Sequence, residues 1–191
     1  MSKGRLEAFS DGVLAIILTI MVLELEIPHE GSFAALRPLI PKFLSYVLSF
    51  VFLSIYWNNH HHLWQAAKHV NGSILWANLH LLFWLSLIPF VTGWMGENNF
   101  STIPVAFYGG VLWFSAVAYY ILARALVAYH GKDSVLAAAI GRDKKGLTSL
   151  YIYTAAIPLA FVASWIAAGL YVIVAIMWLI PDRRIEKQLT K

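Results

Sequence analysis

The chain has 191 residues, of which 60% are hydrophobic and only 13% are charged, and its mean hydropathy is +0.68. Soluble domains carry roughly 25% charged residues, so this composition excludes an ordinary soluble globule and indicates a membrane protein. The sequence has no cysteine, which excludes disulfides, thiol catalysis and thiolate metal sites.

The basic residues do not indicate a nucleic-acid partner. The calculated isoelectric point is 9.3, but the lysines and arginines lie in short clusters between apolar runs. This placement is typical of a polytopic membrane protein. We therefore expect a lipid bilayer around the protein and no nucleic acid as a partner.

Six apolar runs follow one another along the chain, and a helix needs about 20 such residues to cross a membrane. The first run ends in an acidic segment with Pro28 and has no small-residue cleavage site, so we expect a retained helix rather than a signal peptide. Pro38, Pro41 and Pro104 suit the starts of the second and fourth helices. We predict one transmembrane domain, residues 1–191, with spans at about 7–27, 36–63, 73–94, 103–128, 147–164 and 166–181.

The last two spans come from one apolar stretch, residues 147–180, which is too long for one ordinary span and short for two. Pro158 could kink a single helix, or Gly169 could lie in a tight hairpin between two helices. Lysine and arginine concentrate on the cytoplasmic side of membrane proteins. With a cytoplasmic N-terminus and six crossings, only Arg37 and Lys42 of the 14 basic residues fall outside. We therefore predict six spans, the last two short, with both termini in the cytoplasm.

Polar side chains inside the predicted spans gather at one depth of the membrane. Asp11 lies near the start of the first span, and residues 57–62, with the sequence Trp-Asn-Asn-His-His-His, lie near the end of the antiparallel second span. A charge at such a depth costs a few kcal/mol and is usually retained for a reason. Asp11 can accept hydrogen bonds that tryptophan, asparagine or histidine donates. A buried network that fixes helix register is therefore a sufficient explanation.

Two alternative interpretations of these residues are catalytic. Consecutive histidines point about 100° apart on a helix, so three of them cannot converge on one metal ion. His60 could instead meet His80 of the third span, but no carboxylate follows at metal-ligand spacing. A hydrolase built from Ser10, a histidine and Asp11 would need two adjacent side chains to converge, whereas a helix makes them diverge. We expect no catalytic residue, no metal site and no cofactor.

The first span carries a specific pattern, Arg5-x-x-x-Phe9-Ser10-Asp11, followed by Gly-Val-x-Ala-Ile-x-x-Thr over residues 12–19. This pattern resembles the first helix of the TMEM175 family, which are potassium-permeable channels unrelated to the usual potassium channels. The Trp-x-x-His motif at residues 57–60 is also similar to the family. A single six-span unit resembles the prokaryotic form. The resemblance implies a homotetramer whose pore is lined by the first span of each subunit.

The resemblance also implies roles for individual residues. Ile16 falls where the family places its apolar constriction, and Ile20 and Leu23 occupy further apolar layers of the gate. Thr19 falls where a hydroxyl layer is linked to potassium preference. The signature is implied to brace the pore helix rather than to touch the ion, with His60 favoured over His61 by its spacing from the tryptophan. This structural network would comprise Arg5, Phe9, Ser10, Asp11, Trp57, Asn58, His60 and His61.

Helix geometry is compatible with these roles. At about 100° per residue, Ile20 and Leu23 lie within about 40° of Ile16, Thr19 about 60° away and Asp11 about 140° away. The pattern predicts an apolar line flanked by a hydroxyl, with Asp11 turned toward the helices behind it. The alternative is that the aliphatic stripe faces lipid or the protein core.

We therefore expect a channel for monovalent cations, with potassium as the permeant ion, in the bacterial plasma membrane, and no enzyme activity. The chain has no Thr-Val-Gly-Tyr-Gly filter sequence, so a cage of backbone carbonyls is not available and the preference for potassium over sodium should be modest. One alternative is a proton-coupled transporter that uses Asp11 and a histidine as a relay. Another is a membrane enzyme that uses the histidine cluster with a metal.

Overall fold

The computed structural model describes residues 2–131, 134, 137 and 143–179. Every regular element in these ranges is helical, which confirms the predicted all-α fold class. The elements are α1 (Lys3–Leu23), α2 (Phe33–Leu36), the 3-10 helix η1 (Arg37–Leu39), α3 (Ile40–Ala66), α4 (Gly72–Ser86), α5 (Ile88–Glu97), α6 (Thr102–His130), α8 (Lys144–Leu159) and α9 (Ser164–Leu179).

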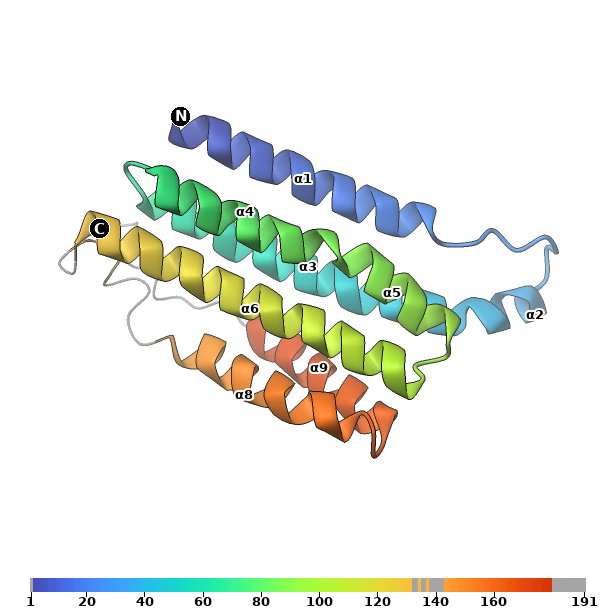
Figure 1. Cartoon of the computed structure of the whole chain (residues 1–191). Coiled ribbons are helices and arrows are strands. Elements are labelled where there is room, and N and C mark those ends of the chain that lie inside the picture. Colours follow the sequence, from blue (N-terminus) through green and yellow to red (C-terminus); the bar gives the residue numbers. More distant parts are fainter. Residues whose placement is uncertain (1, 132–133, 135–136, 138–142, 180–191) are drawn as a thin grey trace.

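The long helices run side by side as one bundle (Figure 1). α1 lies on one side and packs against α3, α4 and α5, while α6 packs against α4, α5, α8 and α9. α8 and α9 form an antiparallel hairpin on the side away from α1 (Figure 1). The start of α1, the α3–α4 loop and the end of α6 lie at the same end of the bundle, which we call the N-terminal end.

Prolines and side-chain caps set several helix boundaries. Pro41 lies in the first turn of α3 and Pro89 in the first turn of α5, where a missing backbone N–H costs no helical hydrogen bond. Asn71 caps α4 by accepting a hydrogen bond from the N–H of Ile74 at 2.9 Å. The predicted third span is therefore two helices, α4 and α5, because the proline interrupts the hydrogen-bond ladder between them. Together they cover residues 72–97.

The last two helices are short, with 16 residues each. At 1.5 Å per residue each is about 24 Å long, less than the hydrocarbon core of about 30 Å. The hairpin turn lies at residues 160–163, where the N–H of Ala163 bonds to the carbonyl of Leu159 at 2.8 Å. The predicted spans place the turn near residue 165, and the alternative hairpin at Gly169 is not realised, because this glycine lies inside α9. The chain turns earlier, just after Pro158, whose ring removes a donor from the last turn of α8.

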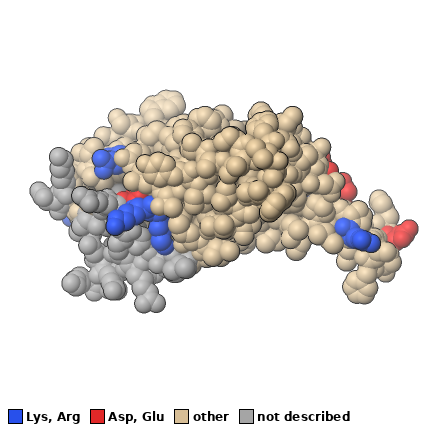
Figure 2. All heavy atoms as spheres, turned by 90° about the horizontal axis from the view of Figure 1, so that it is seen from below, with Lys and Arg blue, Asp and Glu red and all other residues tan. Residues whose placement is uncertain are grey.

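The charges occupy the two ends of the molecule. Figure 2 shows lysine, arginine and acidic side chains toward both ends of the visible face and an uncharged band between them. Four helical segments are long and apolar enough to cross a membrane, at Lys3–Leu23, Phe33–Ala66, Gly72–Glu97 and Thr102–His130. The basic residues at 183–191 and half of the polar linker at 129–146 lie outside the described residues.

One glycine allows α6 and α9 to approach closely. The Tyr171 hydroxyl of α9 donates to the carbonyl of Val105 at 3.2 Å, and its ring lies directly over Gly109, where a Cβ atom would overlap the hydroxyl. Tyr171 is fully buried. The hydroxyl therefore satisfies its donor inside the bundle only because residue 109 lacks a side chain.

Candidate functional site

α1 has one buried face and one open face. Its buried residues, Leu6, Ser10, Leu14, Ile17 and Met21, recur every three or four positions and face α3, α4 and α5. The other face leaves Ile16 60% exposed and Leu23 76% exposed, and Ile20 is also exposed. Thr19 lies on this open face, and its hydroxyl donates to the carbonyl of Ala15 at 2.8 Å. The aliphatic stripe is therefore not part of the core of a single chain.

A groove runs beside this open face. It lies between α1 and α5, is open and largely apolar, and has a volume of about 480 Å³. Ile16 and Ile20 line it from α1, and Pro89 and Phe90 line it from α5. Phe90 is exposed as well, so the apolar surface of α1 continues onto its neighbour.

Asp11 binds the second long helix. The indole N–H of Trp57 in α3 donates to Asp11 Oδ1 at 3.0 Å. A carboxylate that accepts a hydrogen bond forms a stronger contact than two neutral groups do. The Trp57 ring also stacks on His61, with centroids 5.9 Å apart. Asp11 therefore contacts α3, and the stripe that contains Ile16 lies on another side of α1.

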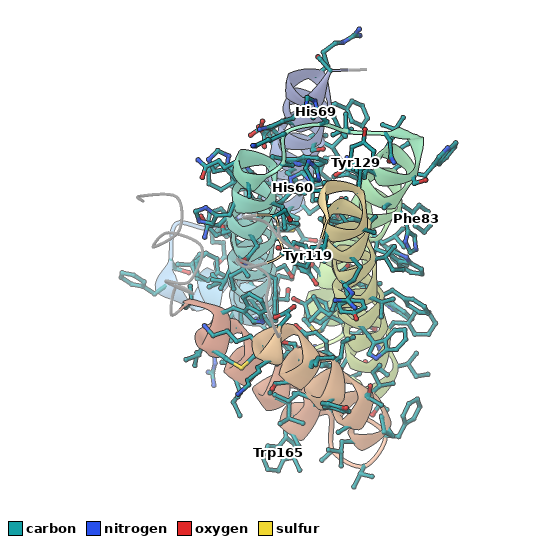
Figure 3. All side chains as sticks on the ribbon, turned by 90° about the vertical axis from the view of Figure 1, so that its left-hand side faces the viewer. His60, His69, Phe83, Tyr119, Tyr129 and Trp165 are labelled. Carbon is teal, nitrogen blue, oxygen red and sulfur yellow. The ribbon has the colours of Figure 1, made fainter. Side chains whose placement is uncertain are left out.

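A second polar chain crosses three helices deeper in the bundle. The Trp64 indole nitrogen lies 3.1 Å from His60 Nδ1 and 2.9 Å from His60 Nε2, and His60 Nε2 lies 2.7 Å from Asn78 Oδ1. Asn78 Nδ2 donates to Ser10 Oγ at 2.9 Å, and the Ser10 hydroxyl donates to the Leu6 carbonyl at 2.9 Å. The chain joins α1, α3 and α4, and Figure 3 shows His60 among these helices.

The donor and acceptor in each hydrogen bond of this polar chain follow from its last member, the carbonyl of Leu6. The Leu6 carbonyl can only accept, so Ser10 must use its hydrogen there and accept from the Asn78 amide. Asn78 Oδ1 must then accept, which places the ring hydrogen of His60 on Nε2. The Trp64 indole lies near both ring nitrogens, and only Nδ1 then has a lone pair to accept from it. Ser10, Asn78 and His60 are all buried. Each buried side chain has a hydrogen-bond partner, so the network can fix the relative positions of the helices.

The structure separates the predicted network residues into five whose side chains make polar contacts within the described part of the chain and three that make none there. Ser10 and His60 join the buried chain, Asp11 and Trp57 form a pair, and His61 Nδ1 lies 3.4 Å from Glu7 Oε1. The other predicted members are exposed, and the described residues offer them no hydrogen bond or ion pair. These residues are Arg5, Phe9 and Asn58.

Sequence reasoning missed Asn78 and Trp64 as members of the network. The alternative in which His60 meets His80 is not realised, because His60 binds Asn78 while His80 accepts from Trp84 on its own helix at 3.0 Å. Two residues of spacing on α4 separate an inward from an outward side chain. An amide inside an otherwise apolar run was the available signal for Asn78.

The two catalytic alternatives gain no support from this geometry. Among the described residues, no group of three histidine or acidic side chains could hold a metal ion. Ser10 donates to a backbone carbonyl, and Asn78 lies between it and His60. A nucleophile must instead be hydrogen-bonded to its base.

An ion-paired cluster lies at the end of the bundle opposite the N-terminal end. Lys42 Nζ lies 2.6 Å from Glu26 Oε1 and 3.1 Å from Glu97 Oε1. The hydrogen bond from Lys42 and its charge lower the pKa of the Glu26 carboxyl from its ordinary value. The cluster joins the segment after α1, through Glu26, to the start of α3, through Lys42, and to the end of α5, through Glu97.

Comparisons with known proteins agree with this arrangement. Residues 5–89 match the family described as endosomal/lysosomal potassium channel TMEM175. A protein of Chryseobacterium sp. named a potassium channel is 56% identical over 189 residues, which cover 99% of this chain and 98% of that protein. The human protein named endosomal/lysosomal proton channel TMEM175 is 40% identical over 75 residues, which cover 33% of this chain and 15% of that protein.

A solved structure extends the agreement to the fold. The crystal structure of a lysosomal potassium-selective channel TMEM175 homolog from Chamaesiphon minutus matches with a TM-score of 0.79 and 26% identity. The match covers 93% of this chain and 96% of that chain. The chain is thus a multi-pass membrane protein, and its sequence and fold place it in the TMEM175 family.

Proposed function

We propose that this chain forms a homotetrameric, potassium-permeable cation channel in the bacterial plasma membrane, with α1 of each subunit lining the pore. The observation that carries the proposal is the open face of α1, on which Ile16, Ile20 and Leu23 are exposed while the opposite face is packed and hydrogen-bonded. One helix cannot enclose a pore, so several copies must bring these faces together. Relatives named potassium channels support the choice of ion.

The proposed gate is a ring of Ile16 side chains. An ion stripped of water in an apolar constriction is very costly, so a narrow aliphatic ring that excludes water can stop conduction. A small widening or rotation of α1 would let water in. Thr19, one turn further along, would supply the only hydroxyl layer on this line, and the preference for potassium should therefore be modest.

The proposed orientation places both termini in the cytoplasm. It rests on the distribution of the 14 lysines and arginines. The N-terminal end of the bundle, with Lys3, Arg5, Lys68 and Arg124, would face the cytoplasm. The end with Glu26 and Lys42 would face outward. Protease protection of tags at the two termini in spheroplasts would test this orientation, and cleavage of either tag from outside would contradict it.

Potassium flux in reconstituted liposomes tests the channel directly. We expect a potassium gradient to drive a flux that collapses a membrane potential set across the liposomes. Flux that is electrically silent or strictly coupled to protons would contradict the proposal and favour the proton-coupled alternative with Asp11. A pH-sensitive dye inside the same liposomes distinguishes these outcomes, which matters because the vertebrate relatives are named proton channels.

The gate is tested by Ile16→Asn. An amide in the constriction should hold water there and raise the potassium flux several-fold. Val22→Asn is the matched control, because Val22 is also exposed on α1 but lies about 120° around the helix from Ile16. If Ile16→Asn assembles normally and its flux equals that of wild type, the gate has been assigned to the wrong residue.

The proposed role of Asp11 is to brace α1. Asp11→Ala should reduce the yield of assembled protein, because it removes a charge-assisted hydrogen bond from Trp57 that is worth about 1.5–3 kcal/mol. Asp11→Asn keeps an acceptor and should restore much of the yield. The ratio of potassium to sodium flux should stay unchanged in both variants, and a changed ratio would contradict the bracing role.

A further inference from the structure

We propose that His130 is a pH-responsive tether, which holds the α3–α4 loop (residues 67–71) to the end of α6 while its ring is neutral and releases the loop when the ring binds a proton. His130 is the last residue of α6. It lies at the N-terminal end of the bundle, the end where Figure 3 labels His69 and Tyr129.

Three hydrogen bonds fix the state of the His130 ring. Its Nδ1 lies 2.9 Å from the carbonyl oxygen of Leu126, and its Nε2 accepts from the backbone N–H groups of Lys68 at 3.0 Å and His69 at 3.2 Å. A carbonyl can only accept, so the ring hydrogen lies on Nδ1. Nε2 must keep its lone pair, because both of its partners are donors. Only the neutral ring with the hydrogen on Nδ1 satisfies all three contacts.

A second proton would break the tether. It would add an N–H at Nε2, which would then face two backbone donors, and both bonds to the loop would be lost. Histidine is the side chain whose ordinary change of charge lies nearest to physiological pH.

Among the described residues, the surroundings offer the protonated ring no opposing charge. The loop contributes Lys68 and His69, whose backbone N–H groups contact the ring, and α6 contributes Tyr129, whose ring centroid lies 5.4 Å from that of His130. The first turn of α4 has no titratable residue. Among the described residues, no carboxylate lies within ion-pair distance of the His130 ring. The charged ring therefore gains no ion pair from the described part of the chain that would compensate for the two lost bonds.

The tethered loop joins α3 and α4, two of the three helices that pack against α1. α3 contributes Trp57, which binds Asp11, and α4 contributes Asn78, which binds Ser10. Release of the loop would free the adjoining ends of both helices. Under the proposed function, on which this step rests, cytoplasmic acidification would change the potassium flux by loosening the support of the pore helix.

The state of the ring can be tested in the wild-type protein without any variant. Nitrogen chemical shifts of the His130 ring at pH 8 should show Nδ1 protonated and Nε2 unprotonated. The opposite tautomer would overturn the proposal. This measurement needs only the labelled full chain in detergent, so it is independent of channel activity.

Amide exchange of Lys68 and His69 tests the release. Their protection, corrected for the intrinsic pH dependence of exchange, should fall by up to about tenfold for each pH unit below the midpoint, because one proton is bound. His130→Gln keeps an acceptor that does not titrate, so its protection should not depend on pH. His130→Leu should show low protection throughout. His69→Gln, which leaves the tether intact, is the control and should behave as wild type does.

The outcomes separate this proposal from the proposed function. Protection that stays constant from pH 8 to pH 5 in wild type, or that falls equally in His130→Gln, overturns the tether. If the tether responds to pH but liposomes with wild-type protein carry no potassium flux at any pH, the channel proposal fails and the tether stands. If flux is present and its pH dependence is identical in wild type and His130→Gln, the coupling of the tether to α1 is wrong.

Discussion

Asn78 offers the most direct test of the buried network, through the substitution Asn78→Ala. Its side chain is fully buried, accepts from His60 and donates to Ser10. The substitution removes both interhelical hydrogen bonds together. It also leaves the His60 Nε2–H without an acceptor, whereas Ser10 keeps its bond to a backbone carbonyl. Most of the damage should therefore arise at the histidine.

The magnitude follows from these contacts. Interhelical hydrogen bonds in membranes are worth about 0.6 kcal/mol on average and up to about 1.7 kcal/mol. An unsatisfied buried donor costs about 1–3 kcal/mol. We expect Asn78→Ala to lower the free energy of unfolding by about 2–4 kcal/mol. Asn58→Ala is the matched control, since Asn58 is exposed and has no hydrogen-bond partner among the described residues, and its effect should stay within about 0.5 kcal/mol.

Reversible unfolding of the purified protein in mixed micelles measures both variants. Adding Ser10→Ala completes a double-mutant cycle, in which the double variant should lose less stability than the sum of the two single variants. A loss below about 0.5 kcal/mol for Asn78→Ala, or an equal loss for Asn58→Ala, would refute the reasoning that the network stabilises the bundle.

Two further expectations concern the α6–α9 contact and the ion-paired cluster. Gly109→Ala places a Cβ against the Tyr171 hydroxyl and should lower the free energy of unfolding by about 1–3 kcal/mol through overpacking. Gly110→Ala is the control, because residue 110 has open space around it, and it should be neutral or stabilising in the same unfolding assay. Equal effects of the two substitutions would contradict the close approach of α6 and α9. The pKa of Glu26 is lowered by Lys42, so the stability from this pair is present above the ordinary carboxyl pKa and is lost as pH falls through the lowered value. Carboxyl NMR titration should show the Glu26 midpoint rising in Lys42→Met, and an unchanged midpoint would show that Lys42 is not the cause.

The predicted spans agreed with the helices where composition alone decides and differed where a single residue decides. The run at 103–128 became α6, Thr102–His130, because proline and serine mark its start and a glycine follows its end. The run at 73–94 was one predicted span but two helices, since Pro89 interrupts it. In the last stretch, both Pro158 and Gly169 could break a helix. Only the packing of α8 against α9 selected the turn after Pro158.

The histidine cluster shows the same limit at the level of side chains. Spacing from Trp57 favoured His60 over its neighbours, and the structure places His60 in the buried chain. The spacing could not identify the hydrogen-bond partner of His60, because Asn78 lies 18 residues further along the chain and reaches His60 only when α3 and α4 are antiparallel. Arg5 and Phe9, which belong to the signature, face away from the rest of the chain.

The sequence by itself determined that this protein is a helical membrane protein with a signature-bearing first helix, because apolar run length and local motifs are properties of neighbouring residues. It also determined that Asp11 and Ile16 lie on different sides of that helix, since the helical period is fixed. Only the tertiary structure decided which polar groups meet, where the last hairpin turns and that His130 reaches the α3–α4 loop. These contacts join residues that are distant in the chain, and their distances and directions depend on how the helices pack.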